Sequence, residues 1–403
     1  MTAQLEKTLV TVRQALEGGK SYRIWLICLA VLIVVGLVAY FRQLHVGLIT
    51  TAMRDQVSWG FYISNFIFLV GVAAAAVLLV VPAYLYDFKP IKEIVLFGEI
   101  AAIVAVAMCI LFIAVDMGQP LRFWHLLPLV GKMNFPASLL IWDVIALVGY
   151  FVINLVLVGY ALHRYASGRE YRLSMMLPLI LISIPWAVSI HTVTAFIFNG
   201  LSSRPFWNAS ILAPRFLASA FCSGPAIMII LFEIMRKYAG LKIEERALSK
   251  IAELVAYTIG INLFLLGAEI FKEFYSGSIH LTPLQYLYFG LDGHFRLVPW
   301  AWLALVFNIL AFVIFLAPEL RRKALTRNMG AALIIVGVYI EKGMGLVVPG
   351  FIPDTLGEIY QYWPSWSEVI ITVGIWATGA LLYTVMAKFA LAALPNAVRA
   401  QDR

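Results

Sequence analysis

Residues 94–116 read IVLFGEIAAIVAVAMCILFIAVD, and this stretch decides the class of fold. It is long enough to cross a bilayer, since a transmembrane helix needs about 20 mostly apolar residues. Its charged residues are Glu99, near one end, and Asp116, at the other. Nine further apolar runs predict an all-α, polytopic integral membrane protein with ten transmembrane helices. We expect the spans at residues 24–41, 58–86, 94–116, 138–162, 173–198, 213–236, 250–274, 298–317, 327–349 and 366–393.

The composition of the whole chain agrees with this class. Of its 403 residues, 62% are hydrophobic and 13% are charged, which is about half the charged share of an average soluble protein. The net charge of +8 has a membrane explanation, because 21 of the 30 Lys and Arg residues fall on the face that holds both termini. The positive-inside rule assigns that face to the cytoplasm. We therefore expect both termini in the cytoplasm and no nucleic-acid partner.

The spacing of acidic residues suggests an internal repeat. The span 94–116 carries Glu99 and Asp116, 17 positions apart, and the span 250–274 carries Glu253 and Glu269, 16 positions apart. A unit of four spans returns to the same membrane face, so the two repeats would be parallel. We predict two parallel-repeat four-helix bundles, made by spans two to five and six to nine, with the first and tenth spans flanking them.

The sequence divides into three parts. Residues 24–393 form the transmembrane domain, and residues 394–403 form a cytoplasmic tail. In residues 1–23, apolar side chains at helical spacing suit a cytoplasmic amphipathic segment on the lipid surface, although a solvated tail explains them equally well. These side chains belong to Leu5, Leu9, Val12 and Leu16.

Two ionisable residues within spans, His191 and Asp143, are the strongest candidates for chemistry. Both are expected near the membrane face opposite the termini and at similar depth. Ionisable groups at membrane depth cost free energy and usually mark a functional site. A carboxylate and a histidine suit proton exchange with a bound molecule, because both exchange protons readily. A core histidine bonded to a neighbouring helix is the structural alternative.

Cofactors with metal are not expected on this chain. Haem in a membrane bundle needs histidines that face one another at depth, and His191 is the one histidine that lies well inside a predicted span. The three cysteines lie in separate spans with no close pair, which argues against disulfides, zinc and a cysteine-ligated cluster. These residues are Cys28, Cys109 and Cys222.

The loops opposite the termini are rich in polar and aromatic residues. The segment 116–125, DMGQPLRFWH, contains Asp116, Arg122 and His125, and the preceding loop contains Trp59. An aromatic belt with anchoring arginines is the common explanation for such residues. Their density favours a surface on which a partner protein docks. Asp116, like Glu269 near the end of its own span, also fits a solvated helix end, and we set Glu341 aside because Lys342 beside it allows an interfacial ion pair.

Four segments, taken in order, resemble the NrfD/PsrC family of quinone-interacting membrane subunits. They are MRDQVSWGFYISNFIFLVGVAAAA at 53–76, DMGQPLRFWH at 116–125, SLLIWD at 138–143 and SIHTVTAFIFNG at 189–200. Ten spans and the DQVSWG segment are most similar to the ten-span branch, with the DsrP subunit of the DsrMKJOP complex and the Hmc and Qrc membrane subunits. The second half of the chain has no motif as clear.

This resemblance implies a fold of two four-helix bundles and a menaquinone site near the periplasmic face. The quinone would be exchangeable, and the chain itself would carry no haem and no iron–sulfur cluster. The implied partners are a periplasmic ferredoxin-like iron–sulfur subunit, a multihaem cytochrome c and further membrane subunits. The implied location is the cytoplasmic (inner) membrane of a bacterium or archaeon. Residues matching the family's site are His191 and Asp143 for proton exchange, with Asp116, Arg122, Trp59, His125 and Glu269 around the quinone.

The expected function is therefore electron exchange between the menaquinone pool and a periplasmic iron–sulfur partner, by a subunit that is not catalytic alone. Two other classes remain open. A secondary transporter also has about ten spans and buried carboxylates, but often has inverted repeats with a mid-membrane site. A passive membrane anchor explains the docking loops but gives no reason for Asp143 at depth.

Overall fold

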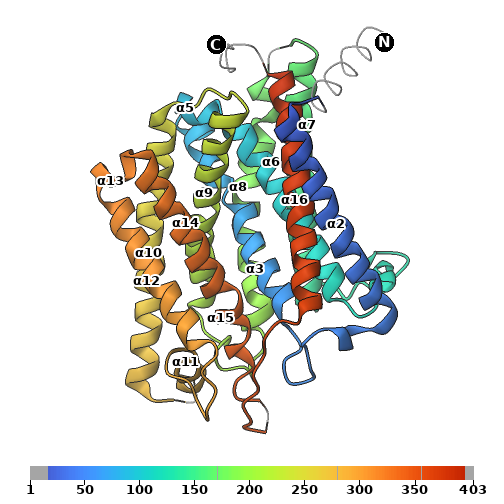
Figure 1. Ribbon diagram of the computed structural model, residues 1–403, viewed down its shortest axis with the longest axis vertical. Coiled ribbons are helices and arrows are strands. Elements are labelled where there is room, and N and C mark those ends of the chain that lie inside the picture. The colour runs from blue at the N-terminus through green and yellow to red at the C-terminus, as the bar shows by residue number, and fades with distance from the viewer. Residues whose placement is uncertain (1–16, 170, 279, 355, 395–403) are drawn as a thin grey trace.

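The computed structural model describes residues 17–394 except 170, 279 and 355. Within this part, ten helical segments are long and apolar enough to span a membrane, as expected. They lie roughly side by side in Figure 1. Their bounds are α2 Lys20–Val46, α3 Phe61–Ala74 with its continuation to Leu85, α6 Val95–Asp116, α7 Leu139–Ala166, α8 Leu173–Asn199, α9 Leu212–Tyr238, α10 Glu245–Ser276, α12 Val298–Leu316, α14 Ala324–Lys342 with its continuation to Phe351, and α16 Trp366–Ala393. The proposed amphipathic stripe from Leu5 to Leu16 lies outside the described residues.

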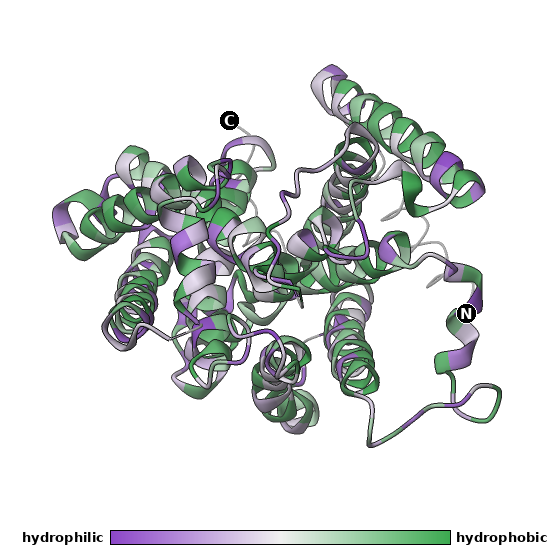
Figure 2. Cartoon of the chain, turned by 90° about the horizontal axis from the view of Figure 1, so that it is seen from below, coloured by the Kyte–Doolittle hydropathy of each residue, from purple (hydrophilic) through white to green (hydrophobic). Residues whose placement is uncertain are grey.

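Short helical turns continue or connect the long helices. They are η1 Leu48–Thr50, α4 Val77–Val80, η2 Val81–Leu85, α5 Lys89–Lys92, η3 Pro120–Leu126, α11 Leu281–Tyr288, α13 Pro318–Arg322, α15 Met344–Val347 and η4 Pro349–Phe351. Hydrophobic colour dominates the long helices in Figure 2, because lipid rather than water is the solvent for their outer surfaces.

The helices pack as two neighbouring groups. In the first group α3 packs against α6 and α8, and α7 packs against α6 and α8. In the second group α9 packs against α10 and α14, and α12 packs against the same two helices. The groups meet where α3 and α8 contact α9, while α16 lies between α2 and α6. The repeat that would relate the two groups stays a prediction.

A pair of glycines lets the first and last spans approach closely. A Cβ atom added to Gly36 of α2 would lie 2.7 Å from Cα of Gly374 on α16. Small residues permit such backbone contact between membrane helices. The indole of Trp25 also donates a hydrogen bond to Thr384 Oγ1 (3.2 Å) across the same pair.

We expect Gly36→Leu to push α2 away from α16 and to lower the stability of the fold by about 1–3 kcal/mol, because the larger side chain overpacks the contact. Thermal unfolding in detergent measures this loss. Val35→Leu is the matched control, because Val35 is 48% exposed and has space for an added methylene. An equal unfolding midpoint for both variants would contradict the glycine contact.

The ninth span is interrupted inside the protein. Helix α14 ends at Lys342, Gly343 has φ −84° and ψ −112°, and the chain resumes as α15 at Met344. Backbone outside regular helix is tolerated at membrane depth where protein surrounds it. Gly345 and Leu346, which follow the break, are buried. The break places Glu341 and Lys342 at the end of a helix in the protein interior.

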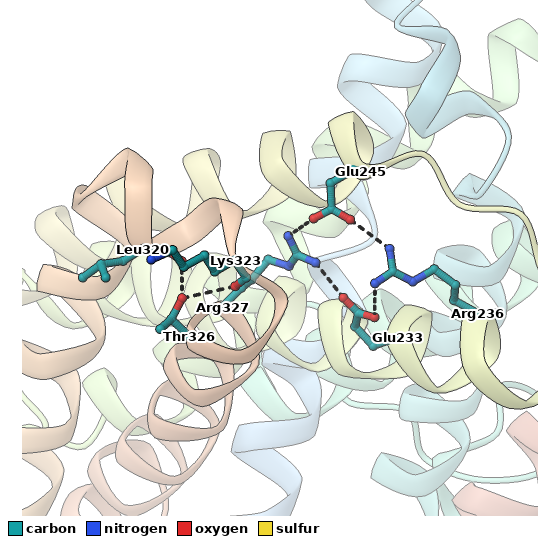
Figure 3. A network of polar contacts seen from close by, with 7 residues as sticks. All are labelled: Glu233, Arg236, Glu245, Leu320, Lys323, Thr326 and Arg327. Atoms are coloured by element: carbon teal, nitrogen blue, oxygen red, sulfur yellow. Dashed lines mark hydrogen bonds and ion pairs between the residues drawn. The ribbon is translucent and has the colours of Figure 1, made fainter.

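At the face where α2 begins and α16 ends, which we call the terminal face, an ionic network ties three helices together (Figure 3). Arg327 of α14 bonds Glu233 of α9 (2.6 Å) and also Glu245 of α10. Arg236 of α9 bonds the other oxygens of both carboxylates, at 2.6 and 2.8 Å. Because Arg327 is fully buried, this ring fixes the ends of α9, α10 and α14 relative to one another.

Candidate functional site

Asp143 lies near the face opposite the terminal face, on the fifth residue of α7, and is 1% exposed. Its Oδ1 accepts a hydrogen bond of 2.5 Å from the hydroxyl of Thr194 on α8. Its Oδ2 is buried and has no hydrogen-bond partner among the described residues. Buried polar atoms nearly always have a partner, so this open acceptor indicates a site for a further group.

His191 precedes Thr194 by three residues on α8, so both side chains lie on one side of the helix. The ring is 2% exposed, and its Nδ1 makes no hydrogen bond within the described part of the chain. Thr194 therefore connects the two predicted residues, bonded to Asp143 and next to His191 on the helix surface. The structure therefore places the two strongest candidates on adjacent helices, α7 and α8, and no hydrogen bond joins them directly among the described residues.

His191 also lines a small cavity where the two helix groups meet. The cavity has a volume of about 10 Å³, and Phe216, Ser219 and Lys342 share its wall. That volume is close to the minimum for one water molecule. Proteins hold small organic ligands in pockets of about 300–1,000 Å³. A quinone ring therefore needs the site to open or must approach it from the lipid side.

Asp116 belongs to a neighbouring polar group rather than to the Asp143 pair. It ends α6 with its Oδ1 buried and unpartnered in the described structure, and its electrostatic neighbours include Tyr62 and Glu368. Tyr62 donates to Gln43 Oε1 (2.7 Å). Glu368 is fully buried and accepts bonds from Tyr362, Ser365 N and Ala52 N. Asp116 is thus a partly buried helix end beside a buried polar group.

Arg122 and His125 lie on the surface. Both side chains are exposed on η3, and the His125 ring stacks on Trp124 with 3.9 Å between ring centres. Neither has a hydrogen bond to Asp143 or His191 in the portion of the chain described here. Their predicted contact with a quinone stays a prediction, and their position also suits the interface with lipid or a partner.

Trp59 is part of an aromatic cluster that covers the end of α8. Its ring lies 5.1 Å from Phe198 of α8 and 5.6 Å from Trp207, measured between ring centres. Trp207 is fully buried and donates to the carbonyl of Leu346 (2.9 Å), just beyond the break in the ninth span. Phe198 follows His191 by two turns of α8. The cluster therefore lies between His191 and the membrane face opposite the terminal face.

Glu269 is not a solvated helix end, because it forms a buried ion pair. Arg215 of α9 bonds Glu269 of α10, and both side chains are 5% exposed. Arg215 also bonds Glu341 Oε1 of α14 at 3.0 Å. The amides of Asn308 and Asn262 donate to Glu341 Oε2 at 2.9 and 3.3 Å. Glu269 therefore belongs to the second helix group, which places it with Glu341 rather than with Asp143.

The interpretation of Glu341 as an interfacial residue was wrong. Its side chain is 8% exposed, and Lys342 Nζ lies 3.9 Å away, farther than Arg215. Sequence reasoning also missed Arg215, which lies three residues beyond the start of α9. The available signal was an arginine inside an otherwise apolar run that begins at 213.

The described part of the chain holds no cluster suited to a metal ion. Over residues 17–394, apart from the three omitted positions, no group of three or more His, Cys, Asp and Glu side chains comes together. Cys109 and Cys222 are buried and unpaired in disulfides, and Cys28 is exposed. The side chains that the site does bring together, a carboxylate, a hydroxyl and an imidazole, are suited to acid–base chemistry.

Ten helical segments of membrane-spanning length, with ionisable side chains buried among them, define a multi-pass membrane protein. Residues 49–351 match the family model "Polysulphide reductase, NrfD". The chain belongs to this family. The match includes both Asp143 and His191 as well as the second-group residues Arg215 and Glu341.

Curated relatives extend the similarity over nearly the whole chain. The Hdr-like menaquinol oxidoreductase integral membrane subunit of Archaeoglobus fulgidus is 23% identical, covering 93% of this chain and 95% of its own length. The menaquinone reductase integral membrane subunit of Nitratidesulfovibrio vulgaris is 21% identical, over 92% and 91%. A selenate reductase subunit of Mesobacillus selenatarsenatis is 23% identical, over 90% and 92%.

Proposed function

We propose that this chain is the quinone-reacting membrane subunit of a multi-subunit oxidoreductase. The supporting observation is the open acceptor of Asp143 beside His191, buried near one membrane face. Family membership agrees, and two relatives carry menaquinol or menaquinone in their names. On this proposal the chain exchanges electrons between the menaquinone pool and a partner's iron–sulfur cluster.

The proposed role of Asp143 follows from its hydrogen bonds. Thr194 occupies Oδ1 and holds the carboxylate in place, which leaves Oδ2 to accept a proton from a quinol hydroxyl. His191 offers its imidazole for the same purpose at the other hydroxyl. Oxidation of a quinol releases two protons and two electrons, so two proton acceptors match the reaction. In the reverse direction the same two groups donate protons.

The quinone is expected to reach Asp143 from the lipid. Leu139, Leu140 and Trp142, in the first turn of α7, are 38–48% exposed and surround the approach. An isoprenoid tail lying along this apolar surface stays in the membrane while the ring is held at Asp143. Trp142 donates to the carbonyl of Pro136 (2.9 Å), and it would have to move for the ring to enter.

The electron partner is proposed to dock on the face opposite the terminal face. Five connecting segments lie there, at 47–60, 117–138, 200–211, 277–297 and 352–365. Exposed Arg122 and the His125–Trp124 stack belong to this surface. We propose a periplasmic ferredoxin-like iron–sulfur subunit as the partner, with a multihaem cytochrome c and further membrane subunits in the same complex. Both termini would then be cytoplasmic, in the inner membrane.

Asp143→Asn tests the proposal. The amide keeps the size of the side chain but cannot take a proton, so we expect menaquinol-dependent turnover of the assembled complex to fall about 100-fold or more. Thr194→Val is a comparison variant, because it removes the hydrogen bond to Asp143 and keeps the carboxylate. We expect turnover to fall less in Thr194→Val than in Asp143→Asn. Copurification of the partner subunits checks assembly. Normal turnover of an assembled Asp143→Asn complex would refute the role of Asp143.

The break in α14 favours a second candidate, a secondary transporter, because interrupted helices with charged residues at membrane depth are typical of that class. Accumulation of a solute by proteoliposomes that contain the chain would support it. A passive membrane anchor, the third candidate, would bind no quinone. If the purified subunit fails to bind a menaquinone analogue, the anchor is the better description.

A further inference from the structure

Lys342 and His191 face the same small cavity, although they come from different helix groups. His191 belongs to α8 of the first group, and Lys342 ends α14 of the second. The hydroxyl-bearing residues Ser219 and Ser223 of α9 complete the polar part of the wall. The cavity is thus a polar contact between the proposed quinone site and the second group.

Lys342 is buried without adequate compensation for a charge. It is 2% exposed, and its Nζ has no hydrogen-bond partner among the described residues. Its nearest carboxylate oxygen, Glu341 Oε1, is 3.9 Å away, and the ring centre of Phe216 is 5.3 Å away. A buried ammonium without hydrogen bonds is unfavourable. Such a lysine can exist as the neutral amine and accept a proton.

Beyond Lys342, charged groups continue through the second helix group. Glu341 bonds Arg215, and Arg215 bonds Glu269. A second cavity of about 30 Å³, with room for water, is lined by Arg215, Glu341 and Tyr288. One turn beyond Glu269 on α10, buried Glu273 bonds Lys272 at 2.7 Å, and Lys272 is 64% exposed. The row therefore ends at the protein surface on the side opposite the terminal face.

We propose that Lys342 carries protons between the quinone site at His191 and the charged row Glu341–Arg215–Glu269 of the second helix group. Protons released by quinol oxidation then leave the membrane interior through the second group rather than past the quinone. This inference rests on the proposed function. It gives the second group, where the sequence shows no clear motif, a part in the reaction.

The transfer balances in protons and involves no electrons. His191, protonated by the quinol, gives its proton to the neutral amine of Lys342 through a water in the shared cavity. The His191 ring becomes neutral, and Lys342 becomes an ammonium. Lys342 then releases the proton to Glu341, whose side chain lines the larger cavity, and the amine is restored.

The test uses the assembled complex with Lys342→Met and Lys342→Arg. Arginine keeps a positive charge but does not give up its proton in proteins. If Lys342 carries protons, both variants lose this function. If Lys342 is only a structural cation, Lys342→Arg keeps it. We expect about a tenfold fall in kcat in both variants, an unchanged dissociation constant for a menaquinone analogue and a larger solvent deuterium isotope effect. Lys250→Met, at an exposed lysine near the terminal face, is the control and should match the wild type.

Three outcomes would overturn the inference. The first is wild-type kcat in Lys342→Met or Lys342→Arg. The second is full recovery by arginine of activity that methionine loses, which assigns Lys342 a structural role. The third is weaker analogue binding in Lys342→Arg, which places Lys342 in the quinone site itself. Failure of the wild-type complex to bind the analogue would overturn the proposed function, and the proton route with it.

Discussion

His191→Ala is expected to abolish menaquinol-dependent turnover, with a fall of at least about 100-fold in kcat and intact assembly. General acid–base groups contribute about 10²–10⁴ to a rate. His191 lies at the junction of the proposed quinone site and the cavity shared with Lys342, so its loss removes a proton acceptor and interrupts the route beyond it. Steady-state turnover of the assembled complex with a menaquinol analogue measures the effect.

Two further variants make this test specific. His191→Gln fills more of the space and keeps hydrogen bonding but does not titrate, so it should fail as badly as alanine. His163→Ala removes an exposed histidine near the other end of α7 and should leave turnover unchanged. An assembled His191→Gln complex with wild-type turnover would show that His191 is a packing residue.

The second large effect concerns stability. Arg327→Met should lower the free energy of unfolding by roughly 3 kcal/mol, because removal of one partner from a buried ionic network leaves uncompensated charge. Arg327 is fully buried between Glu233 and Glu245, and Arg236 alone would remain to neutralise both carboxylates (Figure 3). The expected result is a clear fall in the thermal unfolding midpoint of the purified subunit in detergent.

Arg322→Met is the matched control, since Arg322 is exposed on the neighbouring α13 and its loss should cost little. Combined Arg327→Met and Glu233→Gln should recover part of the stability lost by Arg327→Met, because the second change removes a charge that the first left unpaired. If Arg327→Met unfolds at the wild-type midpoint, the network contributes nothing to stability.

The number of spans could be predicted from the sequence because lipid imposes one strong rule on it. An apolar run such as 95–116 satisfies its backbone within one helix, and no other arrangement crosses the bilayer as cheaply. Helix ends were less certain. The first span was expected from residue 24, whereas α2 begins at Lys20. The ninth was expected at 327–349, where Glu341 and Lys342 interrupt the apolar run, and its helix breaks at Gly343.

The sequence predicts candidate site residues where an ionisable residue lies within an apolar run. Asp143 within an apolar run indicates a buried carboxylate, and the structure buries it. The local sequence around a residue does not show which residue of another helix it contacts. Glu341 and Lys342 look like an interfacial pair because they are adjacent, yet adjacent residues on a helix point in different directions. The partner of Glu341 is Arg215, 126 positions away, and only the packing of α9 against α14 brings them together.

The contact of α2 with α16 has a consequence for biosynthesis. Among the described spans α2 is synthesised before the others, and its extensive helix–helix contact, through Gly36 and Gly374, is with α16. Until α16 is made, α2 waits in lipid without that partner, which its high lipid exposure permits. The capping box of Ser365 and Glu368 starts α16, and Glu368 also accepts a hydrogen bond from Ala52, in the loop after α2. The contact between α2 and α16 therefore forms only after the eight spans between them have been made, and a nascent chain that stops before residue 366 leaves α2 undocked.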